Sequence, residues 1–137
     1  MTDFPDVVEV FSTNSSAHYQ SSVVECFGRY AKIKGEASNG KPVWKHESND
    51  RVLHSNHAGY WCFGTPAAIP DKTCGYISSD LSHKDLDNSG GWEYLMENNT
   101  WHGDLAIIVK GLFTIKTICT LLSRLCLSDC WKKGSIC

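Results

Sequence analysis

Three short segments decide the fold: Pro42-Val43-Trp44-Lys45-His46, Gly59-Tyr60-Trp61-Cys62-Phe63-Gly64 and Gly90-Gly91-Trp92-Glu93-Tyr94. Each combines aromatic or β-branched residues with a glycine or proline at one end. Aromatic and β-branched residues favour strands, whereas glycine and proline favour turns. Short strands separated by turn signals every 8–12 residues or so are typical of an antiparallel sandwich or barrel. The sequence therefore predicts an all-β fold.

Working outward from these segments, the same pattern predicts further strands along the chain. The expected strands are 6–11, 23–33, 41–46, 51–54, 60–63, 75–78, 92–96 and 105–109. We expect the last two to form a hairpin across 97–104. Alternation of side chains along a strand places Trp92, Tyr94 and Met96 on one face.

The C-terminal residues follow a different period. Apolar residues recur at helical spacing in Ile115, Ile118, Cys119, Leu122, Leu125 and Cys126, which predicts an amphipathic helix over 113–127. A membrane span over 105–127 is excluded because three basic residues lie within it, each costing about 2.5–3.5 kcal/mol near the bilayer centre. We thus expect a small antiparallel sandwich or open barrel (1–111) with a C-terminal amphipathic helical extension (112–137).

The charge is divided unevenly between these two regions. Residues 1–104 carry 8 Lys/Arg against 14 Asp/Glu, whereas residues 105–137 carry 5 basic residues against 1 acidic residue. An acidic body argues against nucleic-acid binding, which requires a basic surface. The basic tail is compatible with contact to a membrane surface or an acidic partner.

Seven cysteines in 137 residues, without a Cys-x-x-Cys pair, favour disulfides over a zinc site. Cys62 and Cys74 flank eleven residues that include two prolines. A bridge between them would stabilise the fold by about 3 kcal/mol, and two separate buried thiols are the alternative. The sequons at Asn14 and Asn98 agree with a secreted glycoprotein.

The N-terminal residues have neither the basic nor the apolar region of a signal peptide. We expect a fragment of a larger secreted or extracellular protein; the alternative is an intracellular protein with reduced thiols.

Motifs for catalysis or metal binding are weak. Residues 85–90 match the first half of an EF-hand loop, but Met96 stands where the bidentate Glu should be. His54 and His57 lack the i, i+4 spacing of a metalloprotease. No activated Ser or Cys nucleophile is recognisable. We predict no catalytic residue, no metal and no cofactor.

The aromatic residues are the better candidates for a binding face. Adjacent Tyr60 and Trp61 cannot both point into the core of a regular strand. An exposed aromatic side chain beside polar groups is typical of a sugar- or protein-binding patch. The predicted ligand-binding residues are Trp44, His46, Tyr60, Trp61 and Trp92.

The order of these residues also resembles a known module. The pattern comprises 39–46, 51–53, Tyr60-Trp61-Cys62-Phe63-Gly64, Gly91-Trp92-Glu93-Tyr94 and Trp101. It is similar to a poorly characterised extracellular module of invertebrate multidomain surface and secreted proteins, over about residues 23–110. The resemblance implies a disulfide-bearing β domain used for recognition, with no established catalytic residue.

The sequence thus predicts a non-catalytic, lectin-like binding module that recognises a protein or glycan ligand outside the cell. The alternative is a small secreted effector or toxin-like protein whose tail, 113–133, contacts a membrane or a host partner. A third interpretation is a metal-assisted hydrolase that uses His46, His54 and His57. The sequence does not predict the oligomeric state.

Overall fold

The computed structural model describes residues 4–14, 19–68, 75–79, 86 and 91–113. Within these residues lie nine strands, one short α-helix and one 3₁₀ turn. In chain order they are β1 (Val7–Ser12), α1 (Ser21–Val24), β2 (Gly28–Ser38), β3 (Lys41–His46), β4 (Val52–Ser55), β5 (Trp61–Gly64), η1 (Pro66–Ala68), β6 (Ile77–Ser79), β7 (Trp92–Leu95), β8 (Trp101–Asp104) and β9 (Ile107–Leu112).

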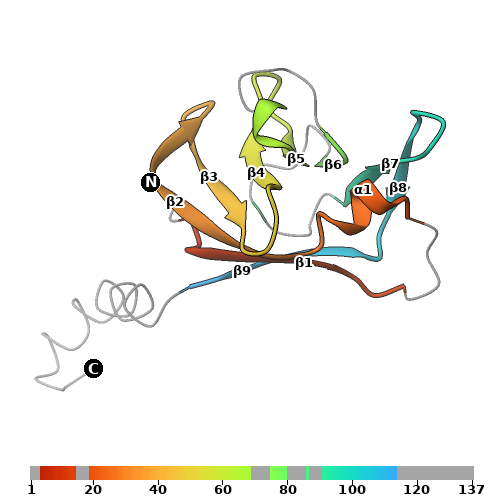
Figure 1. The fold of residues 1–137 in the computed structure, drawn as a ribbon, viewed down its shortest axis with the longest axis horizontal. Coiled ribbons are helices and arrows are strands. Elements are labelled where there is room, and N and C mark those ends of the chain that lie inside the picture. Colours follow the sequence, from red (N-terminus) through yellow and green to blue (C-terminus); the bar gives the residue numbers. More distant parts are fainter. Residues whose placement is uncertain (1–3, 15–18, 69–74, 80–85, 87–90, 114–137) are drawn as a thin grey trace, which may run out of the picture.

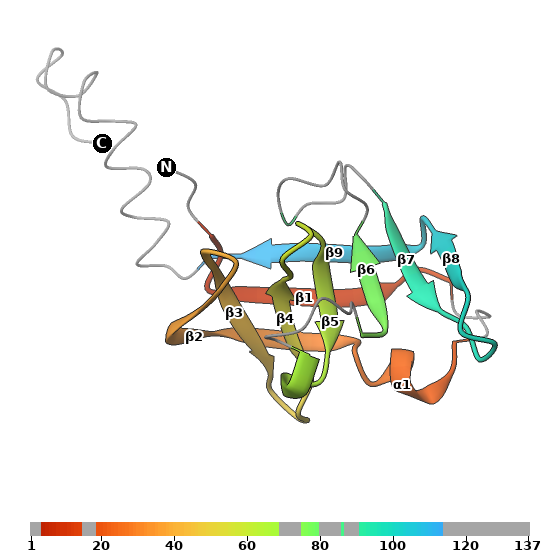
Figure 2. The same cartoon turned by 90° about the horizontal axis from the view of Figure 1, so that it is seen from above.

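The strands form one antiparallel sheet that curls into a nearly closed barrel (Figures 1 and 2). Strands β1 to β8 follow one another as a meander, and β9 then pairs with β1 instead of β8. The order is therefore β8-β7-β6-β5-β4-β3-β2-β1-β9, with β8 and β9 at the two edges. The predicted all-β, antiparallel architecture is confirmed in its barrel-like form.

Local turn chemistry fixes the register of the hairpins. Asn39 and Gly40, with φ of 53° and 72°, form the two-residue connection between β2 and β3. Positive φ at both central residues is the geometry that makes Asn-Gly a preferred hairpin turn. At the β7–β8 turn, Asn99 has φ of 63° and its N–H donates to the carbonyl of Met96.

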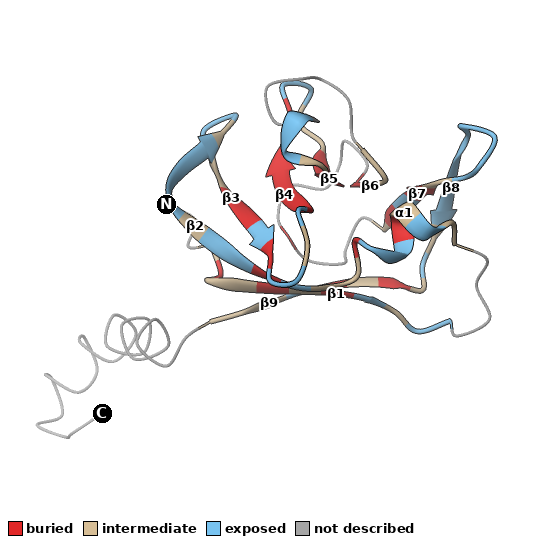
Figure 3. Ribbon diagram, viewed as in Figure 1, coloured by how far each residue is buried: buried red, intermediate tan, exposed pale blue. Residues whose placement is uncertain are grey.

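Large side chains fill the inside of the barrel. Trp44, Trp61 and Phe63 are at most 1% exposed. The rings of Trp44 and Trp61 meet edge to face at 5.9 Å, a favourable aromatic geometry. Buried residues make up half of β3 and all of β4 and β6, whereas most of β8 is exposed (Figure 3). Strands β4 and β5 are buried along their whole length and on both faces.

One predicted strand was right only in part, and one predicted hairpin was wrong. The strand expected over 23–33 begins only at Gly28, because the preceding residues form α1 and a turn. Val23, Cys26 and Tyr30 recur at helix-like i, i+3, i+7 spacing and are all fully buried. The hairpin expected between 92–96 and 105–109 does not form, since β7 pairs with β8 and β9 pairs with β1.

Other predictions lie outside the described residues. These are the amphipathic helix over 113–127 apart from Phe113, the rest of the tail, and the EF-hand-like segment 85–90 apart from Leu86. Strand β9 ends at Leu112, one residue beyond the boundary expected at 111. In the part of the chain that the structure describes, no helix is long and apolar enough to cross a membrane.

Candidate functional site

The five predicted ligand-binding residues lie mainly in the core. Trp44, Trp61 and Trp92 are at most 2% exposed, and His46 is also buried. Tyr60 is half-buried, so of the Tyr60-Trp61 pair only Trp61 points inward, as strand alternation requires. A ligand that contacts the tryptophans would have to enter the barrel. Their role in binding stays a prediction.

His46 is held by two hydrogen bonds. Its Nε2 lies 2.8 Å from the carbonyl oxygen of Phe27, and its Nδ1 accepts the backbone N–H of Ser48 at 2.9 Å. An acceptor opposite Nε2 and a donor opposite Nδ1 together specify the neutral tautomer with the proton on Nε2. The ring also packs edge to face on Tyr30 at 5.0 Å. Both ring nitrogens of His46 are thus occupied by hydrogen bonds to backbone groups.

The three histidines of the predicted hydrolase are not brought together. Trp44 pairs with Leu53, so the side chain of His46, two residues after Trp44, lies on the same face as Leu53. His54 follows Leu53 and therefore points to the opposite face. His57 is exposed in the β4–β5 turn. Among the described residues, no group of three or more His, Cys, Asp or Glu side chains is arranged to hold a metal ion.

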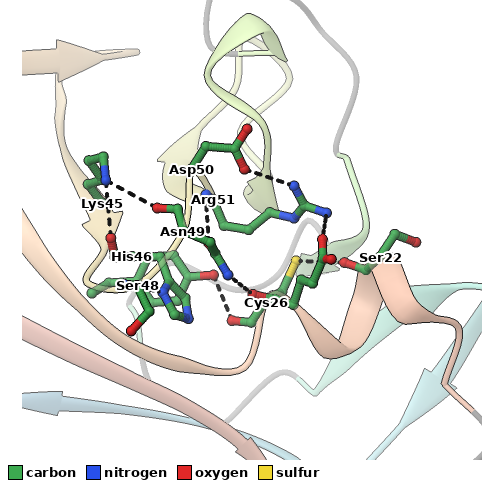
Figure 4. A network of polar contacts seen from close by, with 10 residues as sticks. Ser22, Cys26, Lys45, His46, Ser48, Asn49, Asp50 and Arg51 are labelled. Atoms are coloured by element: carbon green, nitrogen blue, oxygen red, sulfur yellow. Dashed lines mark hydrogen bonds and ion pairs between the residues drawn. The ribbon is translucent and has the colours of Figure 1, made fainter.

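A polar network joins the α1 region to the β3–β4 turn (Figure 4). At its centre, the buried guanidinium of Arg51 contacts Glu25 at 2.5 Å and Asp50 at 3.1 Å. The guanidinium also lies over the ring of Tyr76, 4.7 Å from its centroid. Asn49 adds a hydrogen bond from its Nδ2 to the carbonyl of Glu25 at 2.8 Å. Two segments about 25 residues apart in sequence are thereby fastened together at one end of the barrel.

Cys26 is the nucleophilic side chain in this network. Its Sγ donates to the carbonyl of Ser22 at 3.5 Å. Burial raises the pKa of the Cys26 thiol to about 12, and the nearby guanidinium of Arg51 offsets this only in part. Because the thiolate is the reactive form of cysteine, we expect Cys26 to react slowly at neutral pH. We assign this network a structural role.

The predicted disulfide and glycosylation sites are described only in part. Cys62 is buried, but its expected partner Cys74 lies outside the described residues. Within the described residues there is no disulfide, and the two cysteines among them, Cys26 and Cys62, are not bonded to each other. The sequon asparagines Asn14 and Asn98 are both exposed. The disulfide and the two glycosylation sites stay predictions.

An open depression of about 500 Å³ lies over β1 and the start of β2. Its lining includes Phe11, Phe27 and the ion pair between Glu9 and Arg29, whose charged atoms are 3.7 Å apart. The depression is shallow, and its two charged groups already neutralise each other. It does not present a built site.

Three of the five exposed large apolar residues in the described part of the chain, Met96, Trp101 and Leu105, lie on the β7–β8 hairpin or just after it; the other two are Val24 on α1 and Phe11 on β1. Trp101 is 40% exposed and Leu105 is 87% exposed. Trp101 pairs with Leu95 across the hairpin, and a Cβ on Gly91 would meet Leu105 at 3.5 Å. The outer face of the hairpin therefore carries an apolar group at each end. We call this surface, made of Gly91, Glu93, Leu95, Trp101, Gly103 and Leu105, the outer ribbon.

Sequence reasoning missed the outer ribbon because it placed 97–104 in a loop. The signal that was available is Asn98-Asn99 followed by Trp101, since Asn in a turn favours a hairpin and Trp favours a strand. Comparison with known proteins does not add to this assignment: no family model, no curated protein and no solved structure matches the chain. The candidate site therefore rests on geometry alone.

Proposed function

We propose that this protein is a non-catalytic binding module that recognises a protein ligand through the outer ribbon. The observation that carries the proposal is the exposure of Trp101 and Leu105 on and beside an edge strand. Tryptophan is enriched among the residues that dominate protein interfaces. Other aromatic side chains of the barrel, such as Trp44 and Trp61, are withdrawn into the core. Among the described residues, three of the five exposed large apolar side chains lie on or beside this hairpin.

The chemistry of the described residues supports a non-catalytic role. Burial raises the pKa of the Cys26 thiol to about 12, which disfavours the reactive thiolate at neutral pH. The ring nitrogens of His46 are both occupied by backbone groups. An activated nucleophile and a positioned base, which covalent catalysis requires, are not found together among these residues.

We further propose an extracellular location, in keeping with the resemblance to an extracellular module. Support comes from the seven cysteines and from the exposure of the sequon residues Asn14 and Asn98. In the alternative, a secreted effector, the helix over 113–127 would be the acting element. Deleting 113–137 separates the two proposals, because a binding module with its site on the outer ribbon keeps its ligand.

The test of the proposed function is selection from a phage-displayed library of random 12-residue peptides, beside an array of immobilised glycans. The double variant Trp101→Ser, Leu105→Ser removes the exposed apolar groups. Phe11→Ser is the matched control, since Phe11 is similarly exposed but lies on β1. Peptides retained by the wild type and by the control, and lost by the double variant, support the proposal. Binding to glycans alone, or peptide binding unchanged in the double variant, overturns it.

A further inference from the structure

The backbone of β8 is paired on one side. Within the described residues its partner is β7, and β8 stands at the edge of the sheet (Figure 2). The N–H of Met96 donates to the carbonyl of Thr100 at 2.8 Å, and the N–H of Leu95 donates away from β8, to the carbonyl of Tyr76. Hydrogen-bonded and non-hydrogen-bonded pairs alternate along an antiparallel ladder.

This alternation identifies which groups of β8 point outward. The pair of Leu95 with Trp101 is a non-hydrogen-bonded pair, and so is the pair of Glu93 with Gly103 two residues further on. The N–H and C=O groups of Trp101 and Gly103 are consequently directed to the open edge. An unpaired strand edge of this kind is a template for an added strand.

The side chains of the outer ribbon follow a defined order along the open edge of β8. Along the edge they run from Trp101, through the side-chain-free position Gly103, to Leu105. Behind Gly103, on β7, stands the exposed carboxylate of Glu93. A Cβ built on Gly103 meets no atom within 4 Å, so the space directly above Gly103 is open. The surface is apolar at both ends and acidic in the middle.

We infer that the protein ligand is an extended segment that adds to β8 as an antiparallel strand, with apolar, basic and apolar residues at three alternate positions. This inference rests on the proposed function and specifies its ligand. The antiparallel direction follows from the sheet, in which all neighbouring strands are antiparallel. The central basic residue lies opposite Gly103. Its backbone is two strand spacings, or about 9–10 Å, from the backbone of Glu93, measured across the sheet. Its side chain extends across Gly103 to the carboxylate, while the flanking apolar residues cover Trp101 and Leu105.

The probe is a synthetic peptide, acetyl-Thr-Val-Thr-Lys-Thr-Val-Thr-amide, titrated into the full chain by isothermal titration calorimetry. A second peptide has Glu in place of the Lys. A third carries an N-methyl group on the Lys, which removes the backbone donor that would pair with Gly103. We expect the Lys peptide to bind more tightly than the Glu peptide. We expect the N-methylated peptide to lose at least about tenfold in affinity, because it loses a ladder hydrogen bond and clashes with the edge.

Two charge variants test the role of Glu93. Glu93→Gln should weaken binding of the Lys peptide about two- to fivefold, the range expected of an exposed ion pair. Glu93→Lys should reverse the preference, so that the Glu peptide binds more tightly. Glu97→Gln, an exposed acidic residue in the β7–β8 turn, is the matched control and should leave both affinities unchanged.

Hydrogen exchange at the backbone amides distinguishes strand addition from a contact made by side chains alone. Binding of the Lys peptide should slow hydrogen exchange at the N–H groups of Trp101 and Gly103. Equal affinity for the Lys and Glu peptides, or full binding of the N-methylated peptide, overturns the inference. So does a dimer of this chain, seen by sedimentation, that protects the same two amides and is not displaced by peptide. In any of these cases the proposed function still stands if selected ligands are lost in the Trp101→Ser, Leu105→Ser variant.

Discussion

The Nε2 atom of His46 lies 2.5 Å from the point that a Cβ atom on Gly28 would occupy. Gly28 also has φ of 134°, a conformation that residues with a side chain rarely adopt. The imidazole cannot withdraw without losing its hydrogen bonds to Phe27 and Ser48. The start of β2 and the end of β3 therefore approach each other only because residue 28 has no side chain.

Replacing this glycine should be costly. We expect Gly28→Ala to lower the free energy of unfolding by about 2–3 kcal/mol, through backbone strain and displacement of the imidazole. Gly103→Ala is the control, since the added Cβ meets no atom within 4 Å and should change stability by less than about 0.5 kcal/mol. Urea unfolding followed by tryptophan fluorescence measures both. Equal losses in the two variants would contradict the role given to the His46 contact.

The ion pairs of Arg51 should contribute unequally. The Arg51 side chain is buried, and its contact to Glu25 is shorter than its contact to Asp50, at 2.5 Å against 3.1 Å. Removal of the Glu25 charge leaves a buried cation with a weaker partner, so we expect Glu25→Gln to cost about 1–2 kcal/mol. Asp50→Asn should cost less than about 0.5 kcal/mol. Urea unfolding of both variants decides this, and a larger loss in Asp50→Asn would show that Glu25 is not the main partner.

The Cys26 thiol should be unreactive in the folded protein. Burial raises its pKa to about 12, so almost none of it is thiolate at about pH 8. We expect iodoacetamide to leave Cys26 unmodified in native protein and to alkylate it in denaturing urea, as read by peptide mass spectrometry. Alkylation of the native protein at the rate of an unstructured cysteine peptide would show that the α1 end of the barrel opens.

Strand positions could be predicted from the sequence where local signals agreed. The segment Lys41–His46 lies between an Asn-Gly turn and a polar turn and was predicted with its observed bounds. Strand β8 was missed because Trp101 is its only large apolar residue and His102 and Gly103 are exposed. An edge strand has no buried partner on one side, so its sequence need not carry a strong apolar pattern.

The partners of the elements could not be predicted, because pairing depends on distant parts of the chain. Strand β9 pairs with β1 across about 100 residues, and nothing in its own sequence distinguishes β1 from β8 as a neighbour. Burial of the tryptophans posed the same problem. Strand alternation shows that Tyr60 and Trp61 face opposite sides, but the fold decides which side is inside. The contact between Glu25 and Arg51 likewise depends on how α1 meets the β3–β4 turn.

His54 should make the fold sensitive to acid. It is fully buried on β4, and among the described residues neither ring nitrogen has a hydrogen-bond partner of ordinary geometry. Burial lowers the pKa of His54 below its ordinary value, and the backbone of Ser55 acts in the opposite direction more weakly. The unfolded chain, with a histidine pKa of about 6.5, therefore binds a proton that the folded chain resists.

The stability that comes from neutral His54 is present above about pH 6.5 and is lost as the pH falls below that value. We expect the free energy of unfolding to decrease from about pH 7 to about pH 5, and the decrease to be smaller in His54→Gln. His57→Gln removes an exposed histidine and serves as the control. Urea unfolding across this range measures the effect, and an unchanged pH dependence in His54→Gln would exclude His54 as its source.

Tyr19 should have the corresponding effect in alkali. Its hydroxyl donates to a carboxylate oxygen of Asp104 and lies 2.8 Å from the hydroxyl of Ser12, so it links the ends of β8 and β1. Burial, and then the hydrogen bond to Asp104, raises the pKa of Tyr19 to about 12. The folded state thus retains a proton that the unfolded state releases near pH 10, the approximate pKa of free tyrosine.

Because the folded pKa is the higher one, this stability is complete below about pH 10 and is lost as the pH rises towards about pH 12. Tyr19→Phe should lower stability at neutral pH and reduce the alkaline loss. We expect Tyr19→Phe to keep part of the alkaline loss of stability, since burial also raises the pKa of Tyr30. Tyr60→Phe is the control for removal of a half-buried hydroxyl. Unfolding in urea from about pH 9 upward, with tyrosinate absorbance recorded in parallel, measures both effects. If the two Phe variants lose stability with pH in the same way, the Tyr19–Asp104 contact is not the source of the alkaline loss.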